Sequence, residues 1–206
     1  SIYAVNETRQ EVKNFNTEIK LLNTGSNVLT NKNLIVDIPS NSSVKIMQLD
    51  PLTENEFLSM KLTDANGKRV AGNFYWLSDK PDEFAWDKTN WVFTPLKSFA
   101  DHTPLNELQP TKITIVYKTE VNGSNMKIHT WISNPTDKIA FFISLMLNDE
   151  KGESICPVFW DDNYISLLPG EKREINCTVS RNVVAKTKPQ LLVSGWNIKP
   201  QSITIK

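Results

Sequence analysis

Apolar and polar residues alternate with a period of two along much of the second half of the chain. Residues 112–121 are a clear example, because Ile113, Ile115 and Tyr117 alternate with polar or smaller side chains. This period is typical of a β-strand that buries one face. Turn residues such as Asn122-Gly123 and Pro169-Gly170 separate the runs about every ten residues, as in a β-sandwich of short strands.

The alternation predicts seven antiparallel strands in the second half of the chain, which is the number found in an immunoglobulin-like sandwich. The predicted strands cover residues 112–121, 126–133, 140–148, 155–159, 172–179, 190–196 and 202–206. The fold class is therefore all-β. Trp76, Trp131 and Trp196 lie within apolar runs, so we expect all three to be largely buried.

The first half follows the same pattern with about six strands. The predicted strands cover residues 1–5, 15–22, 33–36, 43–47, 56–62 and 69–76. We expect one strand to be missing before Ser1, so that the chain is a fragment of a longer protein, because an unpaired edge would otherwise remain. The alternative is a sandwich that simply starts in this way. The sequence thus predicts two tandem immunoglobulin-like sandwiches over residues 1–101 and 102–206.

An aromatic linker begins at about residue 77 and ends near Pro110. Its prolines disfavour regular strand pairing, yet a solvated linker would not carry several large aromatic side chains. They either join the two sandwiches or dock on a third domain. The candidates for this interdomain packing are Trp86, Trp91, Phe93 and Phe99.

Composition supports a folded β protein and narrows the range of partners. The 206 residues include 17 Thr, 17 Ile and 14 Val but only 7 Ala, and β-branched side chains favour strands. Lys+Arg 23 balance Asp+Glu 23, so the formal net charge is zero. Without a basic patch or a long apolar run, we expect neither nucleic acid nor a membrane as a partner.

The side chains that could carry chemistry are few. Cys156 and Cys177 are expected to be buried free thiols, a single bridge being the alternative, and with His102 and His129 they form no recognised zinc pattern. We expect His129 to be structural. No metal and no cofactor are predicted, and with no nucleophile elbow or phosphate loop we assign no catalytic residue.

One loop combines aromatic and polar side chains in the manner of a sugar-binding surface. It contains Trp160, Asp161, Asp162, Asn163 and Tyr164, and we take these residues as candidates that face a substrate pocket or a catalytic domain. We expect the loop to lie at a sandwich edge because Pro157 excludes a central strand position. The alternative is a solvated turn with a structural role.

Several segments in order resemble a known family. They are Asn73–Ser78, Trp86-Asp87, Trp91, Thr94-Pro95, Ser98–Asp101, Asn134-Pro135, Ala140–Phe142, Pro157–Tyr164, Leu167–Glu171 and Gly195–Asn197. Together they resemble the C-terminal immunoglobulin-like domains of glycoside hydrolase family 2 enzymes, in the exo-β-D-glucosaminidase and endo-β-mannosidase branch. Residues 1–72 resemble the preceding sandwich only in general pattern.

The resemblance implies a longer enzyme with a jelly-roll domain, an immunoglobulin-like domain and a catalytic (β/α)₈ barrel, followed by two further immunoglobulin-like domains. The implied partners are thus the barrel and the N-terminal domains of the same enzyme, and carbohydrate is reached only through the parent. The resemblance implies that the parent enzyme is a glycosidase. Because no barrel motif is present in these residues, we do not expect this chain alone to be one. The alternative is a free-standing carbohydrate- or protein-binding module.

Overall fold

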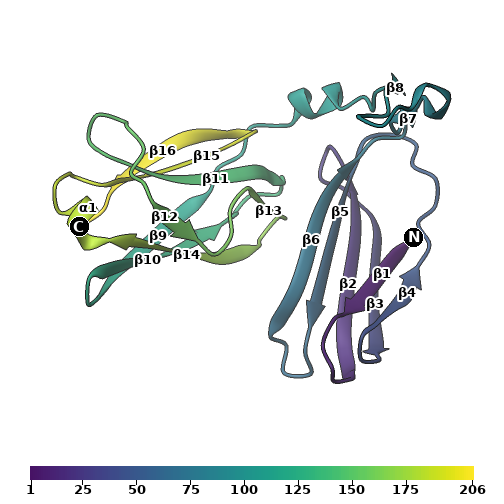
Figure 1. Cartoon of the computed structure of the whole chain (residues 1–206), viewed down its shortest axis with the longest axis horizontal. Coiled ribbons are helices and arrows are strands. Elements are labelled where there is room, and N and C mark those ends of the chain that lie inside the picture. Colours follow the sequence, from purple (N-terminus) through teal and green to yellow (C-terminus); the bar gives the residue numbers. More distant parts are fainter. The chain divides into compact units, whose positions relative to one another are not determined.

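The computed structural model describes all 206 residues, which divide into two compact units, residues 1–108 and 109–206. Figure 1 shows the strands of each unit. Every strand pairing is antiparallel, and helical structure is confined to three short turns. The all-β class and the immunoglobulin-like sandwiches predicted from the sequence are confirmed.

Unit 1 contains a four-stranded sheet and a two-stranded sheet. The large sheet has the order β3-β2-β5-β6, and the small sheet pairs β1 with β4. The bounds are β1 Ile2–Asn6, β2 Val12–Asn23, β3 Val28–Ile38, β4 Ser42–Met47, β5 Glu56–Thr63 and β6 Arg69–Leu77. All six strands were predicted from the alternation of apolar residues, although β2 and β3 are longer than expected.

The core of unit 1 lies between its two sheets. Ile19 of β2 and Leu58 of β5 are buried from the large sheet, and Ile2 of β1 is buried from the small one. On the other face of β2, Glu18 lies beside Lys20 at 2.8 Å and Lys61 at 3.5 Å. Burial acts to raise the pKa of Glu18, but these two lysines together hold it below its ordinary value.

The predicted linker is a hairpin followed by a short helical turn. Strands β7 (Glu83–Phe84) and β8 (Leu96–Ser98) pair, and the 3₁₀ turn η1 (Trp86–Lys88) lies between them. The next 3₁₀ turn, η2 (Thr103–Glu107), buries Leu105. The Nδ1 atom of His102 lies 3.1 Å from Oδ1 of Asn55, which fixes the start of η2 against the loop before β5.

Unit 2 contains two four-stranded sheets with the orders β12-β14-β10-β9 and β13-β11-β15-β16. The bounds are β9 Thr114–Asn122, β10 Asn125–Ser133, β11 Ala140–Asn148, β12 Val158–Trp160, β13 Ile165–Leu167, β14 Lys172–Ser180, β15 Gln190–Gly195 and β16 Ile198–Thr204. A single helical turn, α1 (Arg181–Val184), follows β14.

The two sheets of unit 2 enclose a core of aliphatic side chains. Ile128, Ile132, Ile143, Ile175 and Leu191 are among its fully buried members. The predicted hairpin forms, because Asn122 pairs with Asn125 and Gly123 has a positive φ of 59°. Strands β9, β10 and β14 have an unbroken register along their whole length.

The structure corrects three expectations within this fold. Trp76 and Trp131 are each 39% exposed and Trp196 is 56% exposed, so none of the three is largely buried. Trp131 alternates with the buried Ile132 and lies on the same face as His129, away from the core. Both cysteines are free, but only Cys177 is buried and Cys156 is exposed. Strand β13 was not predicted at all.

Candidate functional site

The loop that contains Trp160 begins in an edge strand, as Pro157 indicated. Strand β12 pairs only with β14, and Trp160 lies opposite Cys177. The side chain of Trp160 is half-buried and packs against the core of unit 2, whereas its neighbour Phe159 is 69% exposed. Trp160 therefore packs partly on the core of its own unit.

The two carboxylates of this loop are bound by different neighbours. Oδ1 of Asp161 accepts a hydrogen bond from the Asn176 backbone N–H at 2.8 Å, and Oδ2 accepts another from Nδ2 of Asn176 at 2.8 Å. Asp162 forms an ion pair with Arg173 and accepts a hydrogen bond from the Asn163 N–H. Asp161 thus extends the pairing of β12 with β14, while Asp162 anchors the turn that follows.

Asn163 joins the loop to the opposite sheet. Its Oδ1 accepts from the Leu145 backbone N–H at 2.8 Å, and its Nδ2 donates to the Leu145 carbonyl at 2.9 Å. The side-chain amide therefore takes the place of a neighbouring strand at this point of β11. Tyr164 follows with a positive φ of 54° and is 59% exposed, with its ring 5.3 Å from that of Phe142.

A small pocket of about 220 Å³ opens beside the loop. Trp160, Asn163 and Tyr164 line it together with Met146 and Cys156. The structure therefore brings three of the five predicted loop residues to one pocket, and Asp161 and Asp162 are not among its lining residues. Both carboxylates instead form the hydrogen bonds and ion pair that hold the loop.

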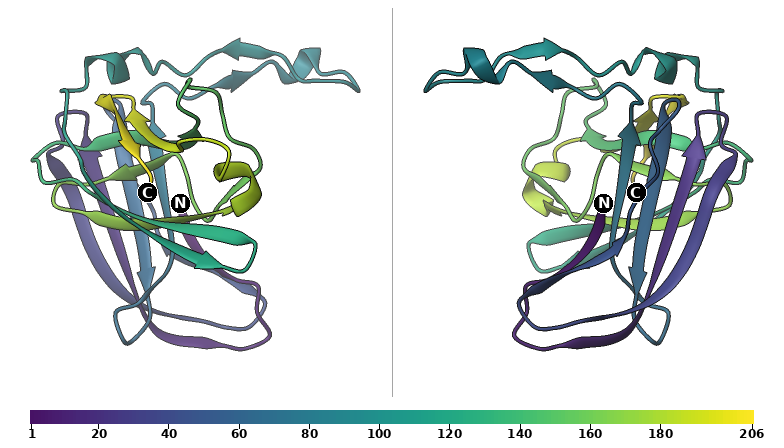
Figure 2. Two further views of the ribbon diagram at one scale, coloured as in Figure 1. Left: turned by 90° about the vertical axis from the view of Figure 1, so that its left-hand side faces the viewer. Right: turned by 90° about the vertical axis from the view of Figure 1, so that its right-hand side faces the viewer.

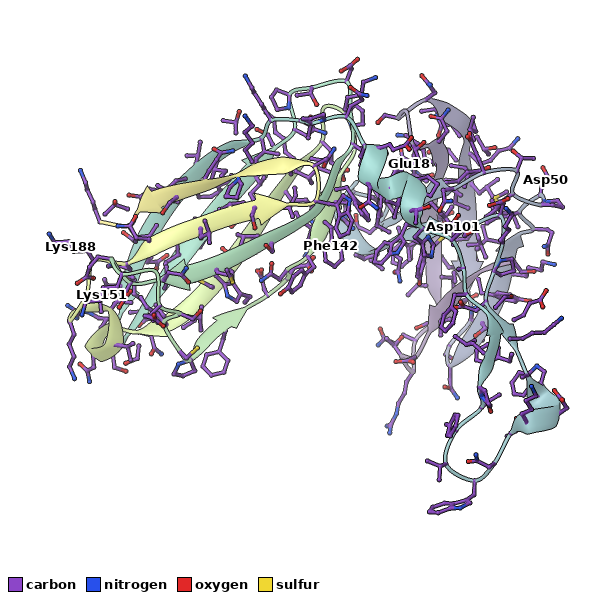
Figure 3. The ribbon with its side chains drawn as sticks, turned by 90° about the horizontal axis from the view of Figure 1, so that it is seen from above. Glu18, Asp50, Asp101, Phe142, Lys151 and Lys188 are labelled. Atoms are coloured by element: carbon purple, nitrogen blue, oxygen red, sulfur yellow. The ribbon has the colours of Figure 1, made fainter.

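The aromatic candidates of the hairpin are at the surface of unit 1. Trp91 is 96% exposed, and Trp86, Phe93 and Phe99 are 71%, 58% and 76% exposed. Figure 2 shows from both sides that the hairpin with β7, η1 and β8 projects beyond the sheets of its unit, and Figure 3 shows it reaching away from the segment at Asp101.

The hairpin keeps its shape through polar contacts near its base and tip. The Ala85 N–H donates to the Pro95 carbonyl at 2.9 Å, which extends the pairing beyond β7 and β8. Oδ1 of Asn90 accepts from the N–H groups of Val92 and Phe93, so the Asn90 side chain closes the turn that displays Trp91. The aromatic surface is thus carried on an ordered element.

The candidates selected from the sequence leave out three other apolar residues of these surfaces. Phe84 and Val92 belong to the exposed apolar surface of the hairpin, and Phe159 belongs to that of the loop. Their signal was present, because each is a large apolar residue within two positions of a residue that was selected. His129 lies on the outer face of β10, with Nδ1 3.2 Å from Glu174 and Nε2 3.5 Å from Glu120.

No group of three or more His, Cys, Asp or Glu side chains is placed to hold a metal ion. No helix is both long enough and apolar enough to cross a membrane.

The fold and these surfaces define a class of protein: a tandem immunoglobulin-like region that displays aromatic side chains on a projecting hairpin and on an edge loop. Two family models match the sequence. Residues 91–198 match the exo-β-D-glucosaminidase Ig-fold domain, and residues 1–80 match the mannosidase Ig/CBM-like domain. The chain belongs to the family of exo-β-D-glucosaminidase Ig-fold domains, and the resemblance to this branch of glycoside hydrolase family 2 is confirmed.

Individual relatives agree with this assignment. The exo-β-D-glucosaminidase of Hypocrea jecorina is 28% identical over 213 residues, which cover 99% of this chain and 23% of the relative. That of Streptomyces avermitilis is 34% identical over 145 residues, covering 69% of this chain and 16% of the relative. The crystal structure of Amycolatopsis orientalis exo-chitosanase CsxA superposes with a TM-score of 0.90 at 25% identity, covering 98% of this chain and 25% of that one.

The chain therefore spans about a quarter of the length of these relatives. In each of these relatives the matched region is one part of a longer polypeptide.

Proposed function

We propose that this chain is the non-catalytic β-sandwich region of a family 2 exo-β-glucosaminidase and that it braces the catalytic barrel. The observation that carries the proposal is the projecting hairpin, on which Trp86, Trp91, Phe93 and Phe99 are all more than half exposed. An apolar surface of this kind is typical of a protein interface. The larger polypeptide offers a surface to cover it, since the chain accounts for about a quarter of the relatives.

The loop with Trp160 and Tyr164 has a second, smaller part in this proposal. Its exposed rings, Phe159 and Tyr164, lie outside the core of unit 2, while Asn163 and Asp161 hold the loop in place. An anchored loop with outward aromatic rings suits contact with the barrel or with a sugar in its pocket. We propose that this loop faces the barrel and contributes a wall to the substrate pocket.

The bracing role is tested in the longer protein with the double substitution Trp91→Ser and Phe93→Ser. Burial of one large aromatic side chain contributes about 2–3 kcal/mol, so the double variant should weaken docking by roughly 4 kcal/mol. We expect this region to become accessible to limited proteolysis, and the melting temperature of the catalytic part to fall. Val116→Ser is the matched control, because Val116 is 58% exposed on β9 and lies outside the hairpin.

The outcome that contradicts the bracing role is a double variant with the same proteolysis pattern and melting temperature as the control. In that case the hairpin does not dock on the enzyme, and a free-standing module becomes the better assignment.

For the loop, Tyr164→Ala in the longer protein should raise KM for glucosaminides about tenfold. An unchanged KM removes the loop from the pocket and leaves the hairpin result unaffected.

A further inference from the structure

The two units share one strand plan, although their sequences differ. The sheet β3-β2-β5-β6 of unit 1 has the same order as β13-β11-β15-β16 of unit 2, when strands are matched in chain order. The same matching aligns β1 with β10 and β4 with β14, and each of these pairs is antiparallel. The units are thus two versions of one sandwich.

Two buried asparagines support this alignment of the two units at the level of single atoms. One lies at the end of β1 and the other just after β10. Nδ2 of Asn6 donates to the carbonyls of Gln10, Ile38 and Pro39, and Oδ1 accepts from the N–H and hydroxyl of Thr8. In unit 2, Asn134 repeats every one of these bonds, and its partners are the carbonyls of Lys138, Leu167 and Leu168 and the N–H and hydroxyl of Thr136. We call this arrangement the Asn-x-Thr corner.

Two strands of unit 2, β9 and β12, have no counterpart in unit 1. Strand β9 pairs with β10 on the side away from β14, and its inward residues Ile115 and Tyr117 pack against the core. The hydroxyl of Tyr117 donates to the Thr204 carbonyl, so β9 also covers β16. In unit 1, β1 pairs only with β4, and its other edge has no neighbouring strand.

A groove of about 360 Å³ lies where the counterpart of β9 would be. Four consecutive residues of β1, Ile2–Val5, line it, so the groove runs along the edge of the strand rather than beneath one face. Its floor comes from the inner faces of β5 and β6, the latter being the counterpart of β16. The floor residues include Met60, Leu62, Ala71, Asn73 and Tyr75.

The groove has the features of an acceptor site for one strand. Leu62 and Ala71 are apolar, and Tyr75 is 44% exposed although it belongs to the inner face of its sheet. Thr17 also lines the groove; it is 6% exposed, and its hydroxyl has no hydrogen-bond partner. Four residues of β1 span about 13 Å, which is the length of a short strand.

We propose that the free edge of β1 accepts one further strand, a counterpart of β9, supplied by a segment of the larger polypeptide outside these 206 residues. The strand pairs with the backbone of β1 and places alternate apolar side chains over β5 and β6. Its source follows from the relatives, of which the chain spans about a quarter. The strand that the sequence analysis expects to be missing from the first sandwich would thus lie beside β1, on the side away from β4.

Unit 2 supplies a strand for the test. A copy of the sequence Lys112–Tyr117, followed by one glycine, is fused directly before Ser1 of the 206-residue chain. Glycine and Ser1 then reproduce the two-residue turn Gly123-Ser124 that joins β9 to β10. By the alignment of the two Asn-x-Thr corners, the tyrosine of the copy lies opposite Ile2, with its two isoleucines directed at the floor of the groove.

We expect the fused strand to raise the melting temperature of residues 1–108 by about 5 °C and to slow deuterium exchange of the backbone amides of Ile2–Asn6 at least tenfold. The control is the same fusion with serine in place of its two isoleucines and its tyrosine. This control strand has the same length and turn but no apolar face, so it should leave both quantities unchanged.

Two results would overturn the proposal. The first is a fused strand that exchanges freely and does not stabilise residues 1–108 relative to the serine control. The second is a dimer of the unmodified chain, detected by sedimentation, in which the β1 amides are protected, because the edge would then belong to a second copy. Neither result depends on what the parent enzyme hydrolyses, so the proposed function is tested separately.

Discussion

At the scale of single residues, the Asn-x-Thr corner is the clearest case of a buried polar group with a defined task. Asn134 is 1% exposed, and its side-chain amide donates to three carbonyl oxygens. Buried polar groups stabilise a fold only when they are hydrogen-bonded, and they are costly when left unpaired. The corner therefore fixes how β10 leads into β11.

We expect Asn134→Ala to lower the free energy of unfolding of unit 2 by about 2–3 kcal/mol, because it removes all the hydrogen bonds that this buried amide forms in the corner. Urea unfolding followed by circular dichroism measures the loss. Asn182→Ala is the control, since Asn182 is an exposed residue of the short turn α1 and should change the free energy by less than about 0.5 kcal/mol. Equal stability of the two variants would show that the corner is dispensable.

The two cysteines should differ sharply in reactivity. Burial raises the pKa of Cys177 to about 12, so this thiol stays protonated at pH 8 and is a poor nucleophile, whereas Cys156 is exposed. A thiol-specific reagent added to the folded chain at pH 8 should label one cysteine, and Cys156→Ser should abolish the labelling. Rapid labelling of both thiols would mean that β14 opens readily.

Glu56 is a buried carboxyl group whose ionisation opposes folding. It is 5% exposed and its Oε2 has no hydrogen-bond partner; burial raises its pKa, and the Thr53 N–H only partly offsets this effect. A carboxyl group whose pKa is raised on folding destabilises the folded state above that pKa and has no such effect below its unfolded value. As the pH rises, Glu56 therefore destabilises the folded state of unit 1 more and more.

Glu56→Gln should therefore raise the melting temperature of unit 1 by a few degrees at pH 7, where the carboxyl is ionised in the unfolded chain and burial opposes that charge in the folded one. At pH 3 the native carboxyl is protonated, so the variant and the native chain should melt together. Thermal unfolding at the two pH values measures the difference. A variant that is less stable than the native chain at pH 7 would contradict this account.

At the scale of elements, alternation located the strands, but a position within an apolar run did not show which face a side chain occupies. Trp131 shows why. It shares its face with Lys127 and His129, and the opposite face carries Ile128 and Ile132, so parity alone placed it outside. Counting it as a core residue because it is large and apolar gave the wrong result.

The strands that were missed or shortened are those whose pairing depends on distant residues. Strand β13 has only three residues, Ile165–Leu167, too few to show a period. Strand β12 begins after Pro157 and ends at Trp160. Its pairing with β14 is continued by hydrogen bonds between Asp161 and Asn176, which are 15 positions apart in the sequence. No local pattern reveals that Asn163 binds the backbone of Leu145.

The anchoring of the edge loop can be tested by comparing Asn163→Ala with Asp162→Ala. Asn163 carries two hydrogen bonds to the Leu145 backbone, so its loss should cost about 1–2 kcal/mol and speed deuterium exchange of the Leu145 N–H. Asp162 and Arg173 form a partly exposed ion pair that should contribute less than about 1 kcal/mol. The reverse order of effects would show that the ion pair holds the loop.

At the scale of the whole molecule, the sequence identified both surfaces of interest but could not show what covers them. The exposure of Trp91 and Phe93 follows from the projection of a hairpin, and that projection depends on the pairing of Glu83 with Ser98 and of Ala85 with Pro95. The partner surface that we propose belongs to domains whose residues are not part of this sequence. Composition could therefore suggest docking but not its location.

The chain by itself should not hydrolyse glycosides. Both conspicuous acids, Asp161 and Asp162, are engaged in hydrogen bonds that hold the edge loop, and they are not among the residues that line its pocket. We expect no turnover of aryl β-glucosaminide, β-mannoside or β-galactoside by the pure chain, with or without added metal. Hydrolysis that is lost in Asp161→Asn or Asp162→Asn would refute this expectation.

The surface position of most tryptophans has an optical consequence. Five of the six indoles are exposed, with Trp91 at 96% and only Trp160 half-buried. The emission of the folded chain should therefore already be close to that of water-exposed indole, and unfolding should shift it little. Binding of the hairpin to a protein surface should shift the emission of Trp86 and Trp91 towards the blue, so the intrinsic fluorescence of this chain reports docking better than it reports folding.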